Sequence, residues 1–112
     1  MSARGLRTAD LESLARKANY HPATMADLYP ISLRQLDRLF ARRFRLTPEL
    51  WCRKLRGTDA IALLSRGYST KAVAIELGFS NESHLCHEFA KLFGKSPQFF
   101  APKIRKAARD VA

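Results

Sequence analysis

Apolar residues recur along this 112-residue chain at the three- and four-residue spacing of amphipathic helices. The clearest apolar stripe lies between residues 33 and 44, and a shorter one lies between residues 11 and 18. The two stripes consist of Leu33, Leu36, Leu39, Phe40 and Phe44, and of Leu11, Leu14, Ala15 and Ala18. No segment alternates apolar and polar residues at period two for long enough to predict a strand. The pattern therefore predicts an all-α fold.

Capping and breaking residues divide the chain into predicted helices. A Ser, Thr, Asp or Asn before an apolar run supplies a side-chain oxygen to the first free N–H groups of a helix. Ser32 with Gln35, and Thr24 with Asp27, resemble capping boxes. The residues expected to begin helices are Asp10, Thr24, Ser32, Thr47, Ser69 and Ser96. The residues expected to end them are Gly67, Gly78 and Gly94.

Two parts of the chain match each other. The segment "FARRFRLTP" starts at Phe40 and "FAKLFGKSP" starts at Phe89, an offset of 49 residues. Upstream, "ADLYPIS" matches "AIELGFS" at an offset of 48, so the second copy has one extra residue after its Ser. Each copy is predicted to be a short helix, a turn and a longer helix. This is the layout of a helix-turn-helix unit, whose second helix enters the major groove of DNA.

The predicted domain organisation follows from the repeat. We expect residues 9–46 to form one subdomain, residues 48–65 a connector helix and residues 69–101 a second subdomain, with a basic tail at residues 103–112. At about 1.5 Å per residue the connector would be on the order of 27 Å long. Successive major grooves on one face of B-DNA are roughly 34 Å apart. A connector of this order would let one monomer hold two recognition helices on one duplex.

The charge indicates the class of partner. The chain has 20 Lys and Arg against 10 Asp and Glu, a net charge of +10. Residues 34–56 hold eight of the basic residues and only two acidic ones. Such a balance favours nucleic acid first and an anionic membrane second. No apolar run approaches the roughly 20 residues that span a bilayer.

Cys52 and Cys86 are too few for a disulfide framework, which predicts a reduced, cytoplasmic protein in which both pack as small apolar residues.

The repeat and its connector resemble the paired helix-turn-helix DNA-binding domain of the AraC/XylS transcriptional regulators. The second copy, "VAIELGFSNESHLCHEFAKLFGKSP", carries the strongest match, "ISLRQLDRLFARRF" matches the first copy, and "KLRGTDAIALL" matches the connector. The resemblance covers roughly residues 11–100. It implies two homeodomain-like three-helix units in a sequence-specific, double-stranded DNA-binding transcription regulator. Neither catalysis nor a cofactor is expected.

The first recognition helix carries the clearest candidates for DNA contact. Arg34, Arg38 and Arg42 recur every four residues and share one face. Arginine bidentate to guanine is the commonest specific base contact, and the resemblance places Arg34 and Arg38 at base-contacting positions. Asp37 could accept from cytosine, but a brace for Arg34 or Arg38 is favoured because a carboxylate is repelled by phosphates. Contacts to phosphate are expected from Ser32, Arg42 and Arg43.

The corresponding surface of the second recognition helix is less basic. The expected base contacts there are Glu82, Ser83 and His87, and the expected phosphate contacts are His84, Lys91 and Lys95. His87 stands where the family usually has Arg, and Leu85 where it usually has Phe. The second helix is therefore expected to read DNA more weakly than the first.

Three further departures from the family concern the backbone. Arg45 stands where many relatives have Gly, as this chain has at Gly94 in its second copy. If that position needs positive φ, Arg costs about 1 kcal/mol there. Gly57 lies inside the connector helix, where it is expected to permit a bend. Pro30 replaces a usual turn glycine.

Other functions fit the sequence less well than this interpretation. A metal site from His84 and His87 is disfavoured, because structural zinc wants four ligands and Cys86 is expected to point elsewhere. Sequence-independent or RNA binding would suit the charge, but the chain has neither an aromatic stacking platform nor a Gly/Arg tract. RNA polymerase is a further partner to consider, although no residue indicates how it would be touched. An effector or dimerisation domain is expected to be absent from 112 residues, in either a stand-alone regulator or a fragment.

Overall fold

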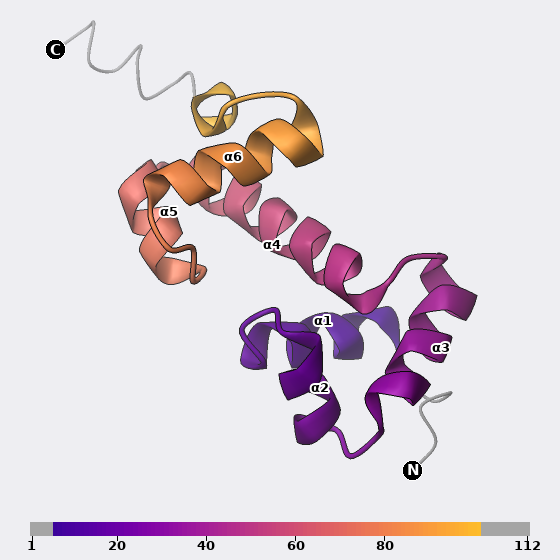
Figure 1. The fold of residues 1–112 in the computed structure, drawn as a ribbon. Helices are drawn as coiled ribbons and strands as arrows, with labels where there is room; N and C mark the ends of the chain where they lie inside the picture. The colour runs from indigo at the N-terminus through magenta and orange to yellow at the C-terminus, as the bar shows by residue number, and fades with distance from the viewer. Residues whose placement is uncertain (1–5, 102–112) are drawn as a thin grey trace, which may run out of the picture. The chain divides into compact units, whose positions relative to one another are not determined.

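A computed structural model describes residues 6–101 of the chain, and these form helices and turns without any strand (Figure 1). The elements are α1 Thr8–Lys17, α2 Pro22–Leu28, α3 Leu33–Phe44, α4 Pro48–Ser65, α5 Thr70–Glu76, α6 Glu82–Phe93 and the 3-10 helix η2 Pro97–Phe100. The predicted all-α fold is confirmed. The basic tail expected at residues 103–112 lies outside the described residues.

The caps explain why most helices begin where the sequence predicts. The Gln35 N–H donates to Ser32 Oγ at 3.1 Å, and the Ser32 N–H donates to Gln35 Oε1 at 2.8 Å, so the predicted capping box forms. Thr47 Oγ1 accepts from the Leu50 N–H at 3.2 Å at the start of α4. Ser69 likewise caps α5. These oxygens satisfy N–H groups that have no partner within the helix.

Two predicted helix starts were wrong. Arg7, and not Asp10, is the N-cap of α1, and the Asp10 carboxylate accepts from the Arg7 N–H at 3.0 Å. Asp10 therefore occupies the third helical position, where an acidic side chain reaches back to the cap. His21, and not Thr24, precedes α2, because Pro22 is the first residue of that helix. Proline suits this position, since its missing N–H would have no helical partner there.

The described chain divides into two compact units between Arg56 and Gly57. The core of the first unit draws on α1, α2, α3 and the first half of α4. The Phe40 ring lies edge-on to Trp51 at 4.9 Å between centroids, and the Phe44 ring stacks on Trp51 at 5.4 Å. The Cys52 sulfur lies 3.5 Å from the Met25 sulfur in the same core. The start of α4 is thus a packing element of this unit.

The core of the second unit is built in the same way. Phe89 is fully buried and contacts the rings of Phe93 and Phe100 at 5.0 and 5.6 Å between centroids. Phe100 therefore holds the place in this unit that Trp51 holds in the first. Gly57 is buried, and a Cβ atom there would lie 2.9 Å from Leu92 Cδ1. The glycine thus permits close approach of α6 to an uninterrupted α4, which is a packing reason and not the bend expected from the sequence.

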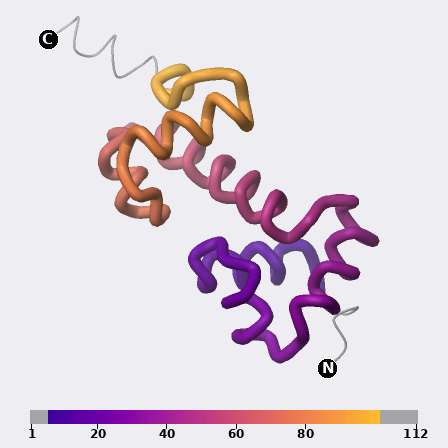
Figure 2. Tube along the Cα trace, in the orientation of Figure 1, coloured from indigo at the N-terminus to yellow at the C-terminus, as the bar shows by residue number. Residues whose placement is uncertain are grey.

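The internal repeat is visible in the backbone of the two units, whose paths from α2 to α3 and from α5 to α6 can be followed in Figure 2. Helices α2 and α5 have 7 residues each, and α3 and α6 have 12 each. The Ile31 N–H donates to the Ala26 carbonyl at 3.3 Å, and the Phe79 N–H donates to the Ala74 carbonyl at 2.9 Å, closing equivalent turns. The extra residue of the second copy is Asn81, which caps α6 as Ser32 caps α3.

Among residues 6–101, no helix is long and apolar enough to cross a lipid bilayer.

Candidate nucleic-acid interface

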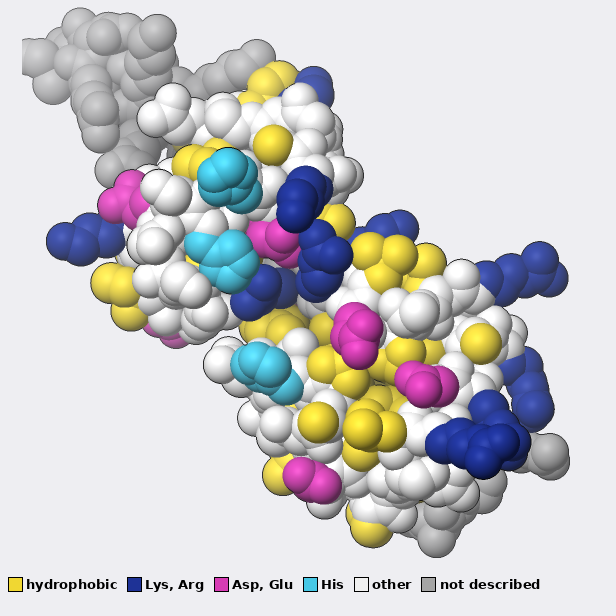
Figure 3. Space-filling view, in the orientation of Figure 1, with side chains coloured by type: hydrophobic (Ala, Val, Ile, Leu, Met, Phe, Trp, Pro, Cys, Tyr) yellow, Lys and Arg dark blue, Asp and Glu magenta, His cyan; other side chains and the backbone are white. Residues whose placement is uncertain are grey.

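Helix α3 separates its apolar and basic residues onto different faces. Leu36 and Phe40 are fully buried, and they fix the orientation of the helix in the first unit. Arg34, Arg38 and Arg42 are exposed and share a face because they are spaced by four residues. Arginine and lysine side chains (dark blue) stand at the surface of the molecule in Figure 3. The local geometry leaves these three guanidinium groups available to an anionic partner.

Asp37 is exposed on α3 between Arg34 and Arg38. Within the described residues, no ion pair joins its carboxylate to either arginine. The brace favoured from the sequence is therefore not formed in this structure. Asp37 instead lines a shallow hollow that also includes Arg45 and Glu49.

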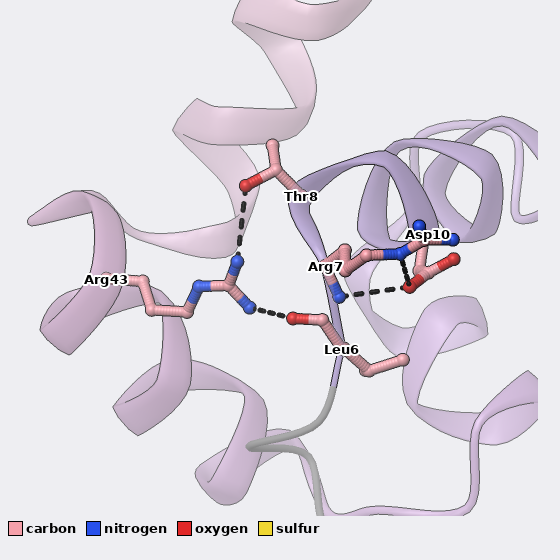
Figure 4. A network of polar contacts seen from close by, with 5 residues as sticks. All are labelled: Leu6, Arg7, Thr8, Asp10 and Arg43. Carbon is pink, nitrogen blue, oxygen red and sulfur yellow. Dashed lines mark hydrogen bonds and ion pairs between the residues drawn. The ribbon is translucent and has the colours of Figure 1, made fainter.

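Arg43 makes contacts that the sequence did not predict. Its guanidinium donates to the carbonyl of Leu6 and to Thr8 Oγ1, the latter at 3.2 Å, so it ties α3 to the start of α1 (Figure 4). The same guanidinium lies 5.4 Å from the centroid of the Phe44 ring. The interaction of Arg7 with Asp10 at 3.3 Å stabilises the same end of α1. Arg43 thus has a structural role, beside which its expected phosphate contact stays a prediction.

The exposed face of α6 forms a second shallow hollow, lined by Glu82, Ser83, Cys86, His87 and Ala90. The structure therefore brings together the three residues predicted to contact bases in this unit. The Glu82 carboxylate accepts from Thr70 Oγ1 at 3.0 Å, which holds it toward the start of α5. Cys86 is exposed on this face, so the expectation that it packs in the core was wrong. Leu85 and Phe89 fill the core in its place.

His84 is oriented by the turn that precedes α6. Its Nδ1 accepts from the Ser80 N–H at 3.1 Å, and its ring meets the Phe79 ring edge-on at 5.3 Å between centroids. The Asn81 side chain accepts from the His84 N–H at 2.8 Å. His84 is consequently half-buried, whereas the other predicted residues of α6 are exposed. Its contacts stabilise the turn between α5 and α6.

The two lysines predicted to contact phosphate in the second unit are both exposed. The Lys95 ammonium lies 3.7 Å from the centroid of the Phe99 ring, an attractive cation–π arrangement. Lys91 occupies in α6 the place that Arg42 occupies in α3. By the same offset of 49 residues, Ser83 replaces Arg34 and His87 replaces Arg38. The exposed face of α6 therefore carries less positive charge than that of α3.

The side chains of the described residues do not assemble a metal centre. No group of three or more His, Cys, Asp or Glu side chains that could hold an ion occurs within residues 6–101. Cys86 and His87 line the same hollow, contrary to the expectation that the cysteine points elsewhere. Leu33, which belongs to the apolar stripe predicted for α3, is 49% exposed at the first position of that helix. Its place in an apolar stripe concealed this exposure.

Comparison with known proteins agrees with this geometry. The family model described as a helix-turn-helix domain matches residues 25–102. An uncharacterized HTH-type transcriptional regulator of Haemophilus influenzae is 28% identical over 101 residues, which cover 88% of this chain and 34% of the relative. The chain thus spans about a third of that relative's length. No solved structure matches this chain significantly. Because the match to the family model covers more than half of the chain, the chain belongs to the helix-turn-helix domain family of AraC type.

Proposed function

We propose that this chain binds double-stranded DNA sequence-specifically and regulates transcription, with α3 and α6 entering successive major grooves. Membership of the helix-turn-helix family supports the coarse function, DNA-binding transcription regulation. The printed name of the Haemophilus influenzae relative, a transcriptional regulator, points the same way. No catalytic role is proposed, in keeping with this family.

The exposed arginine row of α3 is the observation that carries the proposal. Arg34, Arg38 and Arg42 face solvent from a helix whose opposite side is anchored by Leu36 and Phe40. A net charge of +10 attracts the phosphate backbone without regard to sequence. Guanidinium groups on a capped, rigid helix add the bidentate geometry that distinguishes guanine from other bases. Charge and geometry together favour sequence-specific binding.

The roles of individual residues follow from their positions. In the first unit Arg34 and Arg38 contact bases with Asp37 beside them, while Ser32, Arg42 and Arg43 contact phosphates. In the second unit Ser83 and His87 contact bases. Glu82 could also contact a base, but only if its carboxylate gave up the hydrogen bond that it accepts from Thr70. The proposed phosphate contacts of the second unit are His84, Lys91 and Lys95.

The proposed organisation keeps one DNA-reading subdomain at residues 9–46, a connector at residues 48–65 and a second subdomain at residues 69–101. Helix α4 has 18 residues and therefore a length of about 27 Å. This length supports the spanning of neighbouring grooves by one monomer. We further propose that the chain works in the cytoplasm, where the DNA of a bacterium lies. RNA polymerase is a candidate second partner.

Selection of bound sequences from a random DNA pool tests the proposal. We expect one enriched site whose affinity exceeds that of a scrambled duplex by 10³-fold or more, the usual lower range for specific binders. Footprinting of the enriched site should show protection in two major grooves about one helical turn apart. Equal affinity for the enriched and scrambled duplexes would contradict the proposal. Protection of a single groove would contradict the role given to α6.

Sequence-independent binding of nucleic acid is the second candidate. It is favoured by the weakly basic face of α6, where Ser83 and His87 replace the arginines of α3. A protein that only neutralises phosphates loses affinity for all duplexes equally as salt rises. Titration of enriched and scrambled duplexes at several salt concentrations separates the two candidates. A preference for the enriched duplex that survives high salt supports the first.

A further inference from the structure

Leu33 is an apolar residue at a position where the proposed function brings DNA close. It is the first residue of α3, next to Arg34, for which a base contact is proposed, and 49% of its surface is exposed. We propose that Leu33 contacts the C5-methyl group of a thymine in the major groove. The site bound by the first unit would then include a thymine that is recognised through its methyl group. This inference rests on the proposed function and adds an apolar component to it.

The fold itself does not require leucine at this position. The equivalent first residue of α6 is Glu82, which is charged, exposed and hydrogen bonded to Thr70. Both helices are anchored instead by fully buried side chains three positions further on, Leu36 in α3 and Leu85 in α6. An apolar side chain at the start of α3 therefore gains little from packing in its own unit. Its chemistry suits an apolar group supplied by a ligand.

The capping box holds Leu33 in a defined place. Ser32 and Gln35 exchange hydrogen bonds of 2.8 and 3.1 Å across the first turn of α3, which fixes the backbone on both sides of Leu33. The N-terminal residues of a recognition helix are those that contact base edges in helix-turn-helix proteins. A residue whose backbone is already fixed at this position loses little conformational freedom when DNA binds.

The chemistry of leucine selects one feature of the major groove. Its side chain has no hydrogen-bond donor or acceptor, so it cannot pair with the polar edges of guanine, cytosine or adenine. Thymine alone presents a methyl group in this groove. Removing one methyl group from water corresponds to about fourfold in affinity. Arg34 and Arg38 would supply the attraction that brings the leucine to this group.

Replacement of thymine by deoxyuridine tests the inference, because the two bases differ only by the methyl group. The full chain is bound to its enriched duplex, in which each thymine is replaced by deoxyuridine one at a time. We expect one replacement, within the part of the site that Arg34→Ala affects, to weaken binding about fourfold. Leu33→Ala should bind the thymine and deoxyuridine duplexes equally. Leu33→Met keeps an apolar side chain of similar volume and should retain the preference for thymine.

Leu28→Ala is the matched control, because Leu28 is 53% exposed at the end of α2 and has no proposed base contact. It should keep the full preference for thymine, and thermal unfolding should show each variant folded. A preference that is unchanged in Leu33→Ala, or lost in Leu28→Ala, would overturn the inference. So would an enriched site in which no deoxyuridine replacement matters, although the proposed function would then stand. Failure to enrich any site would overturn the proposed function, and this inference with it.

Discussion

Arg45 and Gly94 end helices α3 and α6 in the same left-handed backbone conformation, at φ values of +55° and +67°. Their N–H groups donate to Ala41 and Ala90, respectively, at 3.1 Å in both units. Glycine adopts this conformation without steric cost, whereas a residue with a Cβ atom pays about 1 kcal/mol. The position does have positive φ, which is the condition under which the sequence predicts a cost for Arg45. The first unit therefore carries backbone strain that the second unit avoids.

Arg45→Gly should stabilise the first unit by about 1 kcal/mol, because glycine removes this strain. Gly94→Ala should destabilise the second unit by a similar amount, since a Cβ there meets no neighbour within 4 Å and only the φ angle opposes it. Urea unfolding at equilibrium measures both changes. Arg42→Gly, in the interior of α3, is the control and should lower stability by about 1 kcal/mol. A loss of stability in Arg45→Gly would contradict the strain at this position.

Gly57→Ala should destabilise the second unit, although alanine is the better helix former. The added Cβ would lie 2.9 Å from Leu92 Cδ1 and 3.0 Å from Phe93 Cζ, so these two side chains would have to shift or repack. Overpacking of this kind costs about 1–3 kcal/mol, which exceeds the roughly 1 kcal/mol gained in helix propensity. The free energy of unfolding in urea measures the balance. The double variant Gly57→Ala with Leu92→Ala should lose less than the sum of the two single variants, and strict additivity would argue against the close contact.

Much of the fold could be predicted from the sequence because the apolar spacing and the capping residues indicate the same helix bounds. Helix α3 begins after Ser32 and ends before Arg45, and the repeat transfers those bounds to α6. The start of α1 was missed because an aspartate serves equally well as a cap or at the third helical position, and Asp10 takes the second role. The local sequence does not distinguish these two positions of an aspartate, because they depend on the residue at which the helix begins.

The sequence predicts on which side of its helix each candidate residue lies, but not which other residues it contacts. The exposure of Arg34, Arg38 and Arg42 follows from their spacing opposite the leucines. The hydrogen bonds of Arg43 to Leu6 and Thr8 join residues more than thirty positions apart, and no local pattern reveals them. The close approach of α6 to Gly57 is likewise a tertiary feature. Helical periodicity gives the side on which a residue lies, and packing decides what it touches.

Arg43→Ala should destabilise the first unit, because it removes the guanidinium that ties α3 to the start of α1. A hydrogen bond to a charged group contributes about 1.5–3 kcal/mol at most, and exposure of Arg43 reduces this to about 1 kcal/mol. Thermal unfolding measures the loss. Arg42→Ala removes the same charge from the next position and should change stability by less than about 0.5 kcal/mol. Equal losses in the two variants would show that the contacts of Arg43 contribute nothing.

The two cysteines should differ sharply in reactivity. Burial raises the pKa of the Cys52 thiol to about 11, whereas Cys86 is exposed on α6. A thiol-specific reagent at neutral pH should therefore label one site per native chain and two after unfolding, and Cys86→Ser should abolish the native reaction. Ionisation of the Cys52 thiol is disfavoured in the folded state. The free energy of unfolding should therefore fall as the pH rises from 9.0, the ordinary pKa of this thiol, toward its raised pKa of about 11. Cys52→Ala should remove that part of the pH dependence. Rapid native labelling of Cys52 would contradict its burial.

Arg38→Ala and Lys91→Ala should impair DNA binding in different ways. Arg38 is proposed to contact a base, so its loss should cost about 1–3 kcal/mol on the enriched duplex and relax the preference at one position. Lys91 is proposed to contact a phosphate, so its loss should weaken binding evenly across sequences. It should also reduce the slope of log affinity against log salt by about 0.9. Binding titrations on enriched and scrambled duplexes at several salt concentrations distinguish the two patterns. If Arg38→Ala weakens both duplexes equally, Arg38 contacts the backbone, and base recognition by the first unit must come from Arg34 or from another side chain of α3.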